Sequence, residues 1–172
     1  MKLVILIAVT MMTGVQSPKP KMQVVTAVDL NRYKGTWYEI ARLPNSFEKD
    51  LVCTSANYTL RPDGRITVVN KGRKKDKLSN EKSATGVAWI PDASAPTKLK
   101  VRFFWPFSGN YWILALDKDY KYALIGEPSC KYLWILCRER TIDDSTYNML
   151  LETARENGYD TNPVIRVSQE CN

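Results

Sequence analysis

The sequence contains no histidine. This absence excludes Ser-His-Asp triads, Cys-His pairs, H-E-x-x-H zinc sites and C2H2 fingers, all of which need an imidazole. An enzyme with this sequence would have to use carboxylates, lysine, tyrosine or cysteine. The sequence also lacks an internal repeat, a linker and a nucleic-acid-binding motif, and its 44% hydrophobic content excludes wholesale disorder. The 172 residues fit one globular domain, for which we expect no metal, cofactor or nucleic-acid partner.

No apolar run approaches the ~20 residues that a membrane-spanning helix needs. Residues 3–12 (LVILIAVTMM) are apolar, follow one lysine and precede the small and polar residues 13–17. This pattern is typical of a secretory signal peptide, which we place at residues 1–17, with 18–172 as a single domain. The alternative is a buried strand or helix. No cysteine precedes Cys53, so we expect a soluble, secreted protein without an N-terminal lipid anchor, periplasmic if the source is bacterial.

Basic residues outnumber acidic residues by 25 to 18, which gives a formal net charge of +7. Much of the excess lies in one segment, Lys71–Lys77 (KGRKKDK). A basic balance favours nucleic acid, an anionic membrane or an anionic small ligand as the partner. Because no nucleic-acid motif accompanies it, the segment is interpreted as a solvated hairpin or as a surface for peripheral contact with an anionic membrane.

Eight segments have the composition of β-strands, and most are joined by short loops. They are Trp37–Leu43, Cys53–Arg61, Arg65–Lys71, Lys82–Ile90, Lys98–Trp105, Tyr111–Leu116, Lys121–Ile125 and Tyr132–Arg138. Asp63-Gly64 supplies the positive-φ positions of a tight hairpin. Eight consecutive antiparallel strands close naturally into an up-and-down barrel, which removes exposed sheet edges.

The pattern changes to that of a helix after residue 141. Asp143 is a suitable N-cap, and Gly158 ends the helix. One helical face is formed by four apolar positions: Tyr147, Leu150, Leu151 and Ala154. A short strand at Val164–Val167 follows. The predicted fold is therefore all-β, an eight-stranded antiparallel up-and-down β-barrel with one C-terminal α-helix packed outside.

Several blocks of the sequence carry a family resemblance. Asn31–Arg42 (NRYKGTWYEIAR) resembles the N-x-x-x-G-x-W-Y opening of lipocalins. Ala115–Asp117 and Tyr132–Arg138 resemble the second and third blocks of that family, at compatible spacing. Pro44–Glu48 and Asn70–Gly72 are similar to the bacterial lipocalin and apolipoprotein D branch. The resemblance implies a lipocalin barrel that holds a small hydrophobic ligand.

The first and third blocks have physical interpretations of their own. Gly35 lets the chain bend tightly into the first strand, and Trp37 can plug the closed end of the barrel. Arg138 matches the family's arginine that stacks across this tryptophan, an interaction of ~0.5–2 kcal/mol. These three residues are therefore expected to be structural.

The four cysteines allow three full pairings. Cys130 and Cys137 flank one predicted strand, whose ~23 Å length far exceeds the ~6 Å Cα separation of a disulfide. The resemblance to the apolipoprotein D type implies a disulfide between Cys53 and Cys171. The cysteine that would pair with Cys130 in that type is missing here. Cys130 and Cys137 are therefore expected to be thiols or intermolecular links, and the protein to be a monomer or a dimer.

The alternation of the barrel strands predicts a cavity. If the first strand begins at the closed end, the open mouth is formed by residues 44–50, 74–80, 106–110 and 127–129. The predicted rim residues are Phe47, Arg73, Lys74, Lys75 and Lys77. The resemblance and the two-residue period place ten side chains inward: Tyr58, Leu60, Val68, Asn70, Val101, Phe103, Tyr111, Ile113, Trp134 and Leu136. The alternative is a barrel packed shut with side chains.

Asn57, in an N-glycosylation sequon, points outward as a candidate glycosylation site in a eukaryotic source.

Three functions remain open at this point. The first is a non-enzymatic carrier or scavenger of a small hydrophobic ligand such as a fatty acid, lysophospholipid, sterol, retinoid or tetrapyrrole. The second is an antioxidant or isomerase-type lipocalin that uses Cys130 or Cys137. The third is a pigment-binding or membrane-surface module. The inward residues favour the first, since they are apolar and aromatic with few hydrogen-bonding groups.

Overall fold

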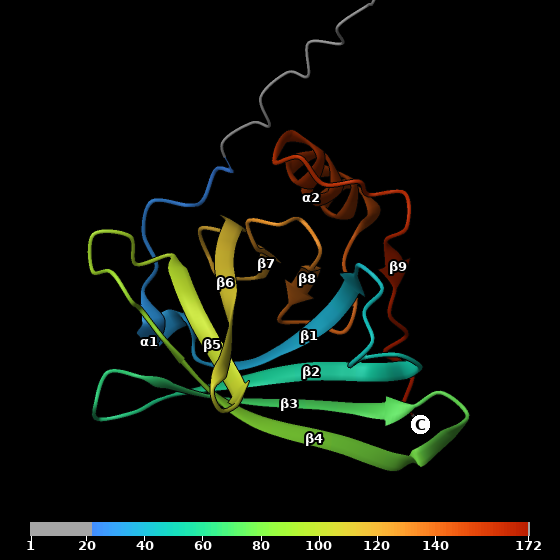
Figure 1. Cartoon of the computed structure of the whole chain (residues 1–172). Helices are drawn as coiled ribbons and strands as arrows, with labels where there is room; N and C mark the ends of the chain where they lie inside the picture. Colours follow the sequence, from blue (N-terminus) through green and yellow to red (C-terminus); the bar gives the residue numbers. More distant parts are fainter. Residues whose placement is uncertain (1–21, 172) are drawn as a thin grey trace, which may run out of the picture.

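The computed structural model describes residues 22–171, so the predicted signal peptide, residues 1–17, lies outside the described residues. In this range the chain forms nine strands and two helices (Figure 1). In chain order they are α1 (Leu30–Tyr33), β1 (Gly35–Arg42), β2 (Leu51–Leu60), β3 (Ile66–Lys74), β4 (Lys77–Trp89), β5 (Lys98–Phe104), β6 (Phe107–Leu116), β7 (Tyr122–Gly126), β8 (Leu133–Cys137), α2 (Asp144–Glu156) and β9 (Ile165–Arg166). Neither helix is long and apolar enough to cross a membrane.

The strands form a closed antiparallel barrel. Each strand from β2 to β8 pairs with the next, and β1 closes the barrel by pairing with both β8 and β2. Trp37 lies opposite Ala56 of β2, and Tyr38 lies opposite Cys137 of β8. The two residues of β9 extend the pairing at the end of β1. The predicted eight-stranded up-and-down barrel with one C-terminal helix outside it is confirmed.

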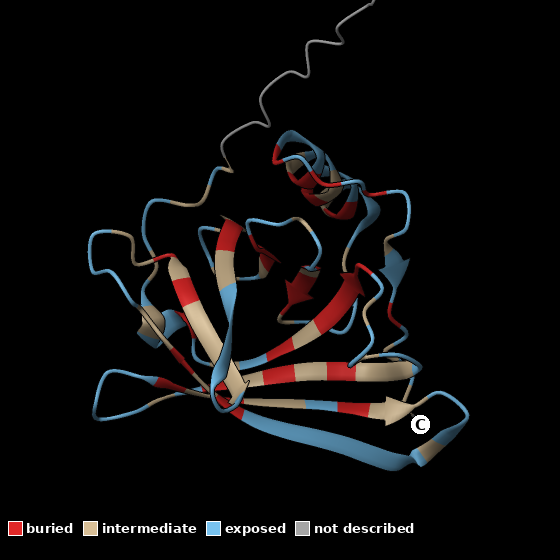
Figure 2. Ribbon diagram, in the orientation of Figure 1, coloured by how far each residue is buried: buried red, intermediate tan, exposed pale blue. Residues whose placement is uncertain are grey.

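Two mouth loops predicted from the sequence are instead part of strands. β3 continues to Lys74 and β4 begins at Lys77, so only the two-residue turn of Lys75 and Asp76 remains of the predicted loop at 74–80. β6 begins at Phe107, so only Pro106 remains of the predicted turn at 106–110. The added residues of β4 and β6 are mostly exposed and lack the alternation of a half-buried strand, so backbone pairing extends these strands where the hydrophobic pattern gives no signal. Figure 2 shows the resulting exposure of much of β4.

The side chains of the barrel wall pack into two hydrophobic clusters, one inside the barrel and one outside it. The inner cluster fills the closed part of the barrel and includes Tyr33, Trp37 and Ile113. The outer cluster joins the barrel to α2 and includes Ile40, Leu124, Ile135, Leu150 and Ala154. Strand residues alternate between the two clusters, as the two-residue period of a strand requires. The barrel therefore has an interior that is separate from the core under its helix.

The closed end is built around Trp37 and Arg138. Trp37 is fully buried, and its Nε1 donates a hydrogen bond to the carbonyl of Tyr33 at 2.8 Å. The Arg138 guanidinium lies 4.0 Å from the centroid of the Trp37 ring and donates to the carbonyls of Arg32, Thr36 and Lys34 at 2.7, 2.9 and 3.0 Å. The arginine thus satisfies backbone acceptors of the segment that leads into β1.

Gly35 completes this arrangement at the start of β1. Its φ of +95° is a conformation that favours glycine, and a Cβ atom here would lie 3.3 Å from Nη1 of Arg138.

The preceding helix α1 was not predicted, because a four-residue helix leaves no periodic signal. It is capped by the side chain of Asp29, which accepts a hydrogen bond from the backbone N–H of Asn31.

The C-terminal tail is joined covalently to the barrel. Cys53 of β2 and Cys171 form the predicted disulfide, with a Cα separation of 5.9 Å. The tail is further held by the side-chain amide of Gln169, whose Nε2 donates to the carbonyls of Glu39 and Thr54 at 2.8 and 2.9 Å. The tail therefore links β1 and β2 on the outside of the barrel.

We predict that the substitution Arg138→Met lowers the free energy of unfolding by ~2–4 kcal/mol. It removes charge-assisted hydrogen bonds and the contact with the indole of Trp37, while most of the apolar stem is kept. Urea denaturation followed by far-UV circular dichroism measures the change. Arg61→Met is the control, because the ion pair of Arg61 with Asp63 is exposed. Equal losses in the two variants would contradict a special role for Arg138.

Candidate functional site

The barrel interior above the closed end is a cavity of about 820 Å³. Its wall is mainly apolar and includes Ile66, Ala88 and Leu99. Nine of the ten predicted inward residues line it: Tyr58, Val68, Asn70, Val101, Phe103, Tyr111, Ile113, Trp134 and Leu136. The volume lies in the range typical of small-molecule sites, so the barrel is not packed shut.

Leu60 is the exception among the predicted inward residues. It is the last residue of β2, pairs with Ile66 across the hairpin at the closed end, and packs against the inner cluster instead of lining the cavity. The two-residue period gives the correct face for Leu60 but does not tell where along the strand the side chains fill the barrel completely.

The structure places the five predicted rim residues in two different regions. Phe47 lines the cavity mouth, but Arg73, Lys74, Lys75 and Lys77 do not. These four lie at the β3–β4 hairpin tip, beyond the barrel; the side chain of Arg73 donates to the carbonyl of Cys171 at 3.0 Å. The lysines that do line the cavity are Lys71 and Lys82.

Three tyrosine hydroxyls meet on the cavity wall. The hydroxyl of Tyr111 lies 2.6 Å from that of Tyr33 and 2.9 Å from that of Tyr58. Burial raises the pKa of all three phenols, so they are uncharged at neutral pH. Their rings are also in contact, with centroids of Tyr33 and Tyr58 5.4 Å apart. The cluster offers neutral hydrogen-bonding groups within an otherwise apolar region.

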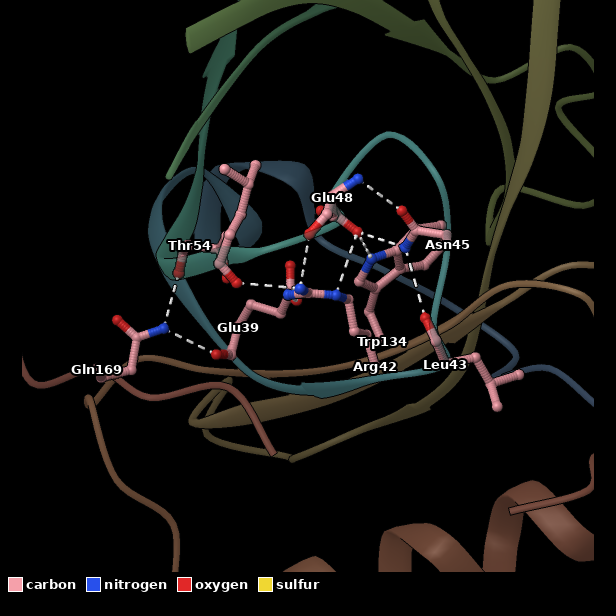
Figure 3. A network of polar contacts seen from close by, with 9 residues as sticks. Glu39, Arg42, Leu43, Asn45, Glu48, Thr54, Trp134 and Gln169 are labelled. Carbon is pink, nitrogen blue, oxygen red and sulfur yellow. Dashed lines mark hydrogen bonds and ion pairs between the residues drawn. The ribbon is translucent and has the colours of Figure 1, made fainter. Parts of the chain in front are cut away.

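A network of polar side chains, drawn in Figure 3, joins β1 to the mouth loop at residues 44–50. Nη1 of Arg42 donates to Oε1 of Glu39 at 2.6 Å, and Nη2 donates to the carbonyls of Glu48 and Leu51 at 2.8 and 3.0 Å. Oε2 of Glu48 in turn accepts from Nε1 of Trp134 at 3.0 Å. These contacts fix the position of the loop that carries Phe47, and both carboxyls line the cavity.

A β-bulge makes this network possible. In a regular strand, Glu39 and Arg42 would point to opposite faces, because they are three residues apart. The pairing of β1 with β8 shifts between Glu39 and Ala41, and both Ile40 and Ala41 belong to the outer cluster. The extra residue reverses the alternation, so Arg42 returns to the side of Glu39.

The network changes the ionisation of Glu39. Burial raises its pKa, the neighbouring carboxyl of Glu48 raises it further, and Arg42 opposes both effects, with a result of about 8. Glu39 is therefore mostly protonated at neutral pH, and the single arginine balances the charge of Glu48.

The remaining predicted residues lie outside the cavity. Cys137 is buried in the outer cluster, and its thiol donates to the carbonyl of Thr141 at 3.5 Å. The half-buried Cys130 packs on the same cluster, and its thiol donates to the carbonyl of Asn157 at 3.8 Å. Asn57 is half-exposed on the outer face, where its Nδ2 donates to the hydroxyl of Thr36 at 2.9 Å.

Sequence reasoning missed several polar cavity residues: Tyr33, Glu39, Glu48 and Thr54. A signal existed for Glu39 and Thr54. Glu39 is two residues from Trp37, and Thr54 is four residues from Tyr58, so each shares the inward face of a recognised residue. Glu48 lies in the predicted mouth loop 44–50, beside the predicted rim residue Phe47, whereas no signal existed for Tyr33, which lies in a four-residue helix.

A family model described as a lipocalin-like domain matches residues 28–169. The chain belongs to the lipocalin family. This lipocalin is 40% identical over 156 residues to outer membrane lipoprotein Blc of Vibrio cholerae, covering 90% of this chain and 88% of that protein. It is 43% identical to temperature-induced lipocalin-1 of Arabidopsis thaliana (88% and 84% covered) and 36% identical to apolipoprotein D of Macaca fascicularis (83% and 77% covered). The predicted resemblance to the bacterial and apolipoprotein D branch is confirmed.

Solved structures agree with the fold of this lipocalin. Insecticyanin from the tobacco hornworm Manduca sexta superposes with a TM-score of 0.68 at 25% sequence identity, covering 87% of this chain and 85% of that chain. Apocrustacyanin C1 gives a TM-score of 0.67 at 18% identity, covering 82% and 79%, and supports the fold alone.

The raised pKa of Glu39 predicts that stability falls with rising pH. The unfolded carboxyl loses its proton near its ordinary value of 4.5, whereas the folded one keeps it until about 8. The folded state binds more protons between these values, so the free energy of unfolding decreases across the window, by at most ~1.4 kcal/mol per pH unit. The absence of histidine leaves few other side chains that titrate here.

Urea denaturation at pH 5, 6, 7 and 8 tests this prediction. Glu39→Gln should flatten the dependence, while the exposed control Glu81→Gln should retain it. A parent protein whose stability is constant or rises over this range would contradict the prediction, as would an unchanged slope in Glu39→Gln.

Proposed function

We propose that this lipocalin is a secreted, non-enzymatic carrier or scavenger of a small hydrophobic molecule. The observation that supports this most directly is the cavity of about 820 Å³, lined by apolar side chains and open at one end of the barrel. Candidate ligands are a fatty acid, lysophospholipid, sterol, retinoid or tetrapyrrole. Secretion rests on the predicted signal peptide at residues 1–17.

Burial of an apolar tail supplies the affinity in this mechanism. Each methylene removed from water contributes ~0.8 kcal/mol, so about a dozen contribute roughly 10 kcal/mol. Association costs ~4–15 kcal/mol, which leaves micromolar binding within reach of the tail alone. A lysine exposed at the mouth adds only ~0–1 kcal/mol. Lys71 and Lys82 would thus adjust head-group preference, while the apolar wall provides the binding energy.

The cysteine-dependent alternative gains no support from this geometry. Neither Cys130 nor Cys137 lines the cavity, and both thiols donate to backbone carbonyls on the outer side of the barrel. Burial raises the pKa of the Cys137 thiol, which disfavours the reactive thiolate.

Blocking the mouth from β4 tests the carrier function. Ala84 lines the cavity, whereas the adjacent Thr85 is exposed on the other face of the same strand. We predict that Ala84→Trp weakens binding of the neutral fluorophore N-phenyl-1-naphthylamine by at least ~10-fold, because the indole occupies the space of the ligand. The matched control Thr85→Trp should change binding by less than ~2-fold. Equal effects of the two variants would place the fluorophore elsewhere.

Native mass spectrometry of the purified protein identifies the natural cargo. A discrete added mass of a few hundred daltons that is lost on denaturation is the result expected for a filled cavity.

A second candidate function, loading from an anionic membrane surface, is favoured by the β5–β6 hairpin. Phe104, Trp105 and Phe107 at its tip are 75%, 80% and 78% exposed. Adjacent exposed aromatics of this size mark a contact site, and tryptophan suits the boundary between water and lipid. Phe104 and Phe107 also line the cavity mouth, so a membrane at this tip would adjoin the entrance.

The charge of the neighbouring hairpin fits this surface. The β3–β4 connection lies at the same end of the barrel by topology and carries Lys74, Lys75 and Lys77. Each lysine close to an anionic bilayer contributes ~1 kcal/mol to binding, and salt screens this contribution. Aromatic insertion and charge would therefore act together.

Cosedimentation with phosphatidylcholine–phosphatidylglycerol vesicles tests the second function. We predict that replacing Phe104, Trp105 and Phe107 by serine reduces the bound fraction at least ~5-fold, since each aromatic loses its burial in lipid. Replacement of Met149 and Ile165 by serine is the control, because these exposed apolar residues lie at α2 and β9. Vesicle binding that survives the triple replacement would contradict the proposal.

A further inference from the structure

The long strand β4 has a free backbone edge at the mouth of the cavity. β4 has 13 residues and β5 has 7, and their pairing covers only Val87–Trp89 (Figure 1). Continuation of this register would place Thr85 opposite Phe104, where β5 ends and the chain turns into β6. The residues Glu81–Thr85 pair with β3 on one side, and no strand of the described chain pairs with their other side.

The free edge presents unpaired backbone groups to solvent. In an antiparallel strand, each residue directs its N–H and C=O groups to one neighbouring strand, and the next residue directs them to the other. About half of the backbone groups of Glu81–Thr85 therefore point away from β3, and all five residues are exposed. Such accessible donors and acceptors are the usual template for an added strand.

This edge adjoins the apolar cavity. Lys82, Ser83 and Ala84, at the middle of the edge, line the cavity from β4. Phe104 and Phe107 line it from β5 and β6, on the other side of the point where β4 and β5 separate. A molecule whose apolar part fills the barrel can therefore reach the backbone of β4 with the part that remains at the mouth.

The shape of the edge disfavours a second copy of this chain as its partner. Arg73 pairs with Glu81 but Lys74 pairs with Lys77, so residues 78–80 interrupt the pairing of β3 with β4 and end the regular edge. The edge also carries the charged residues Glu81 and Lys82. Short edges, bulges and charges keep proteins from pairing edge to edge. A ligand anchored by its tail needs only a few hydrogen bonds here.

The groups that complement this edge are secondary amides. The edge alternates N–H donors with C=O acceptors, and an extended peptide supplies the same two groups at the same spacing. A carboxylate or phosphate only accepts hydrogen bonds, so it would leave the carbonyls of the edge without a partner. The charges of Glu81 and Lys82 have opposite sign, so together they favour neither an anion nor a cation.

We propose that the edge Glu81–Thr85 is a subsite for the peptide part of an N-acyl peptide. The acyl chain fills the cavity, and the first residues of the peptide extend along β4 as an added strand. This inference rests on the proposed carrier function and goes beyond it, because it names a class of ligand that the apolar wall alone does not select.

Competition binding with three uncharged probes tests the subsite on the parent protein. N-dodecanoyl-trialanine amide carries the tail and the backbone amides, its N-methylated analogue lacks the backbone N–H donors, and N-acetyl-trialanine amide lacks the tail. Displacement of N-phenyl-1-naphthylamine at pH 7 gives their affinities. We expect the dodecanoyl peptide to bind ~5- to 30-fold more tightly than its methylated analogue, the value of one or two hydrogen bonds. The acetyl peptide should bind at least ~100-fold more weakly, since tail burial supplies most of the affinity.

Proline substitutions at adjacent positions test the backbone contact. Ser83 and Ala84 direct their N–H groups to opposite sides of β4, so Ser83→Pro and Ala84→Pro remove one N–H from the free edge and one from the pairing with β3. The free-edge variant is the one that keeps the melting temperature of the parent protein. It should reduce the preference for the dodecanoyl peptide over its methylated analogue to less than ~3-fold. The control Thr85→Val keeps every backbone N–H of β4 and should retain the preference.

The possible failures are distinguishable, and the probe comparison on the parent protein is independent of how stable the variants are. Equal binding of the two dodecanoyl probes, or a preference that survives in the free-edge variant, overturns the subsite while the carrier function stands. A concentration-dependent dimer that the free-edge variant abolishes assigns the edge to a second copy and also overturns the subsite. A parent protein that binds neither the fluorophore nor any probe overturns the carrier function and the subsite with it.

Discussion

Closure of the barrel through β1 is the constraint on which the rest of the structure depends. This strand pairs with β2 on one side and β8 on the other, so it is the seam between the first and last strands of the barrel. Its alternating side chains serve three purposes: Trp37 plugs the closed end, Glu39 faces the cavity, and Ile40 packs in the outer cluster. The β9 pairing and the Gln169 contacts hold the same strand from outside. A disturbance of β1 therefore reaches the core, the cavity and the tail together.

The bulge in β1 explains how this seam tolerates the buried carboxyl group of Glu39. A carboxyl at the position of Glu39 would be costly in an apolar wall without a partner. The additional residue at the bulge turns Arg42 inward, where it is shared between Glu39 and the mouth loop. The network thereby couples the loop that carries Phe47 to the strand that closes the barrel. The position of the entrance is set by the same contacts that satisfy the buried acid.

Sequence patterns were sufficient to predict the barrel but not to predict where its strands end or where a strand is irregular. The resemblance predicted an inward Tyr58, and alternation added Val68 and Ile113; the structure places all three in the inner cluster, where packing requires apolar residues at every second position. Alternation could not show that the barrel fills before Leu60, or that backbone pairing carries β3 and β4 past the packed region. The lysines at that hairpin tip were consequently assigned to the rim. The bulge was equally invisible, since it depends on the pairing between β1 and β8.

Selectivity in such a cavity depends on the hydrogen bonds that a ligand gives up and forms when it enters. The apolar wall binds any tail of suitable length, so affinity alone distinguishes ligands weakly. A ligand head group that enters the cavity gives up its hydrogen bonds to water and must replace them with polar groups of the wall, such as the hydroxyls of Tyr33, Tyr58 and Tyr111, or leave them unmade. Unmade bonds penalise a mismatched head group more than matched bonds reward a correct one. A few polar groups in an apolar barrel thus disfavour ligands with mismatched head groups, which a uniformly apolar interior would do less selectively.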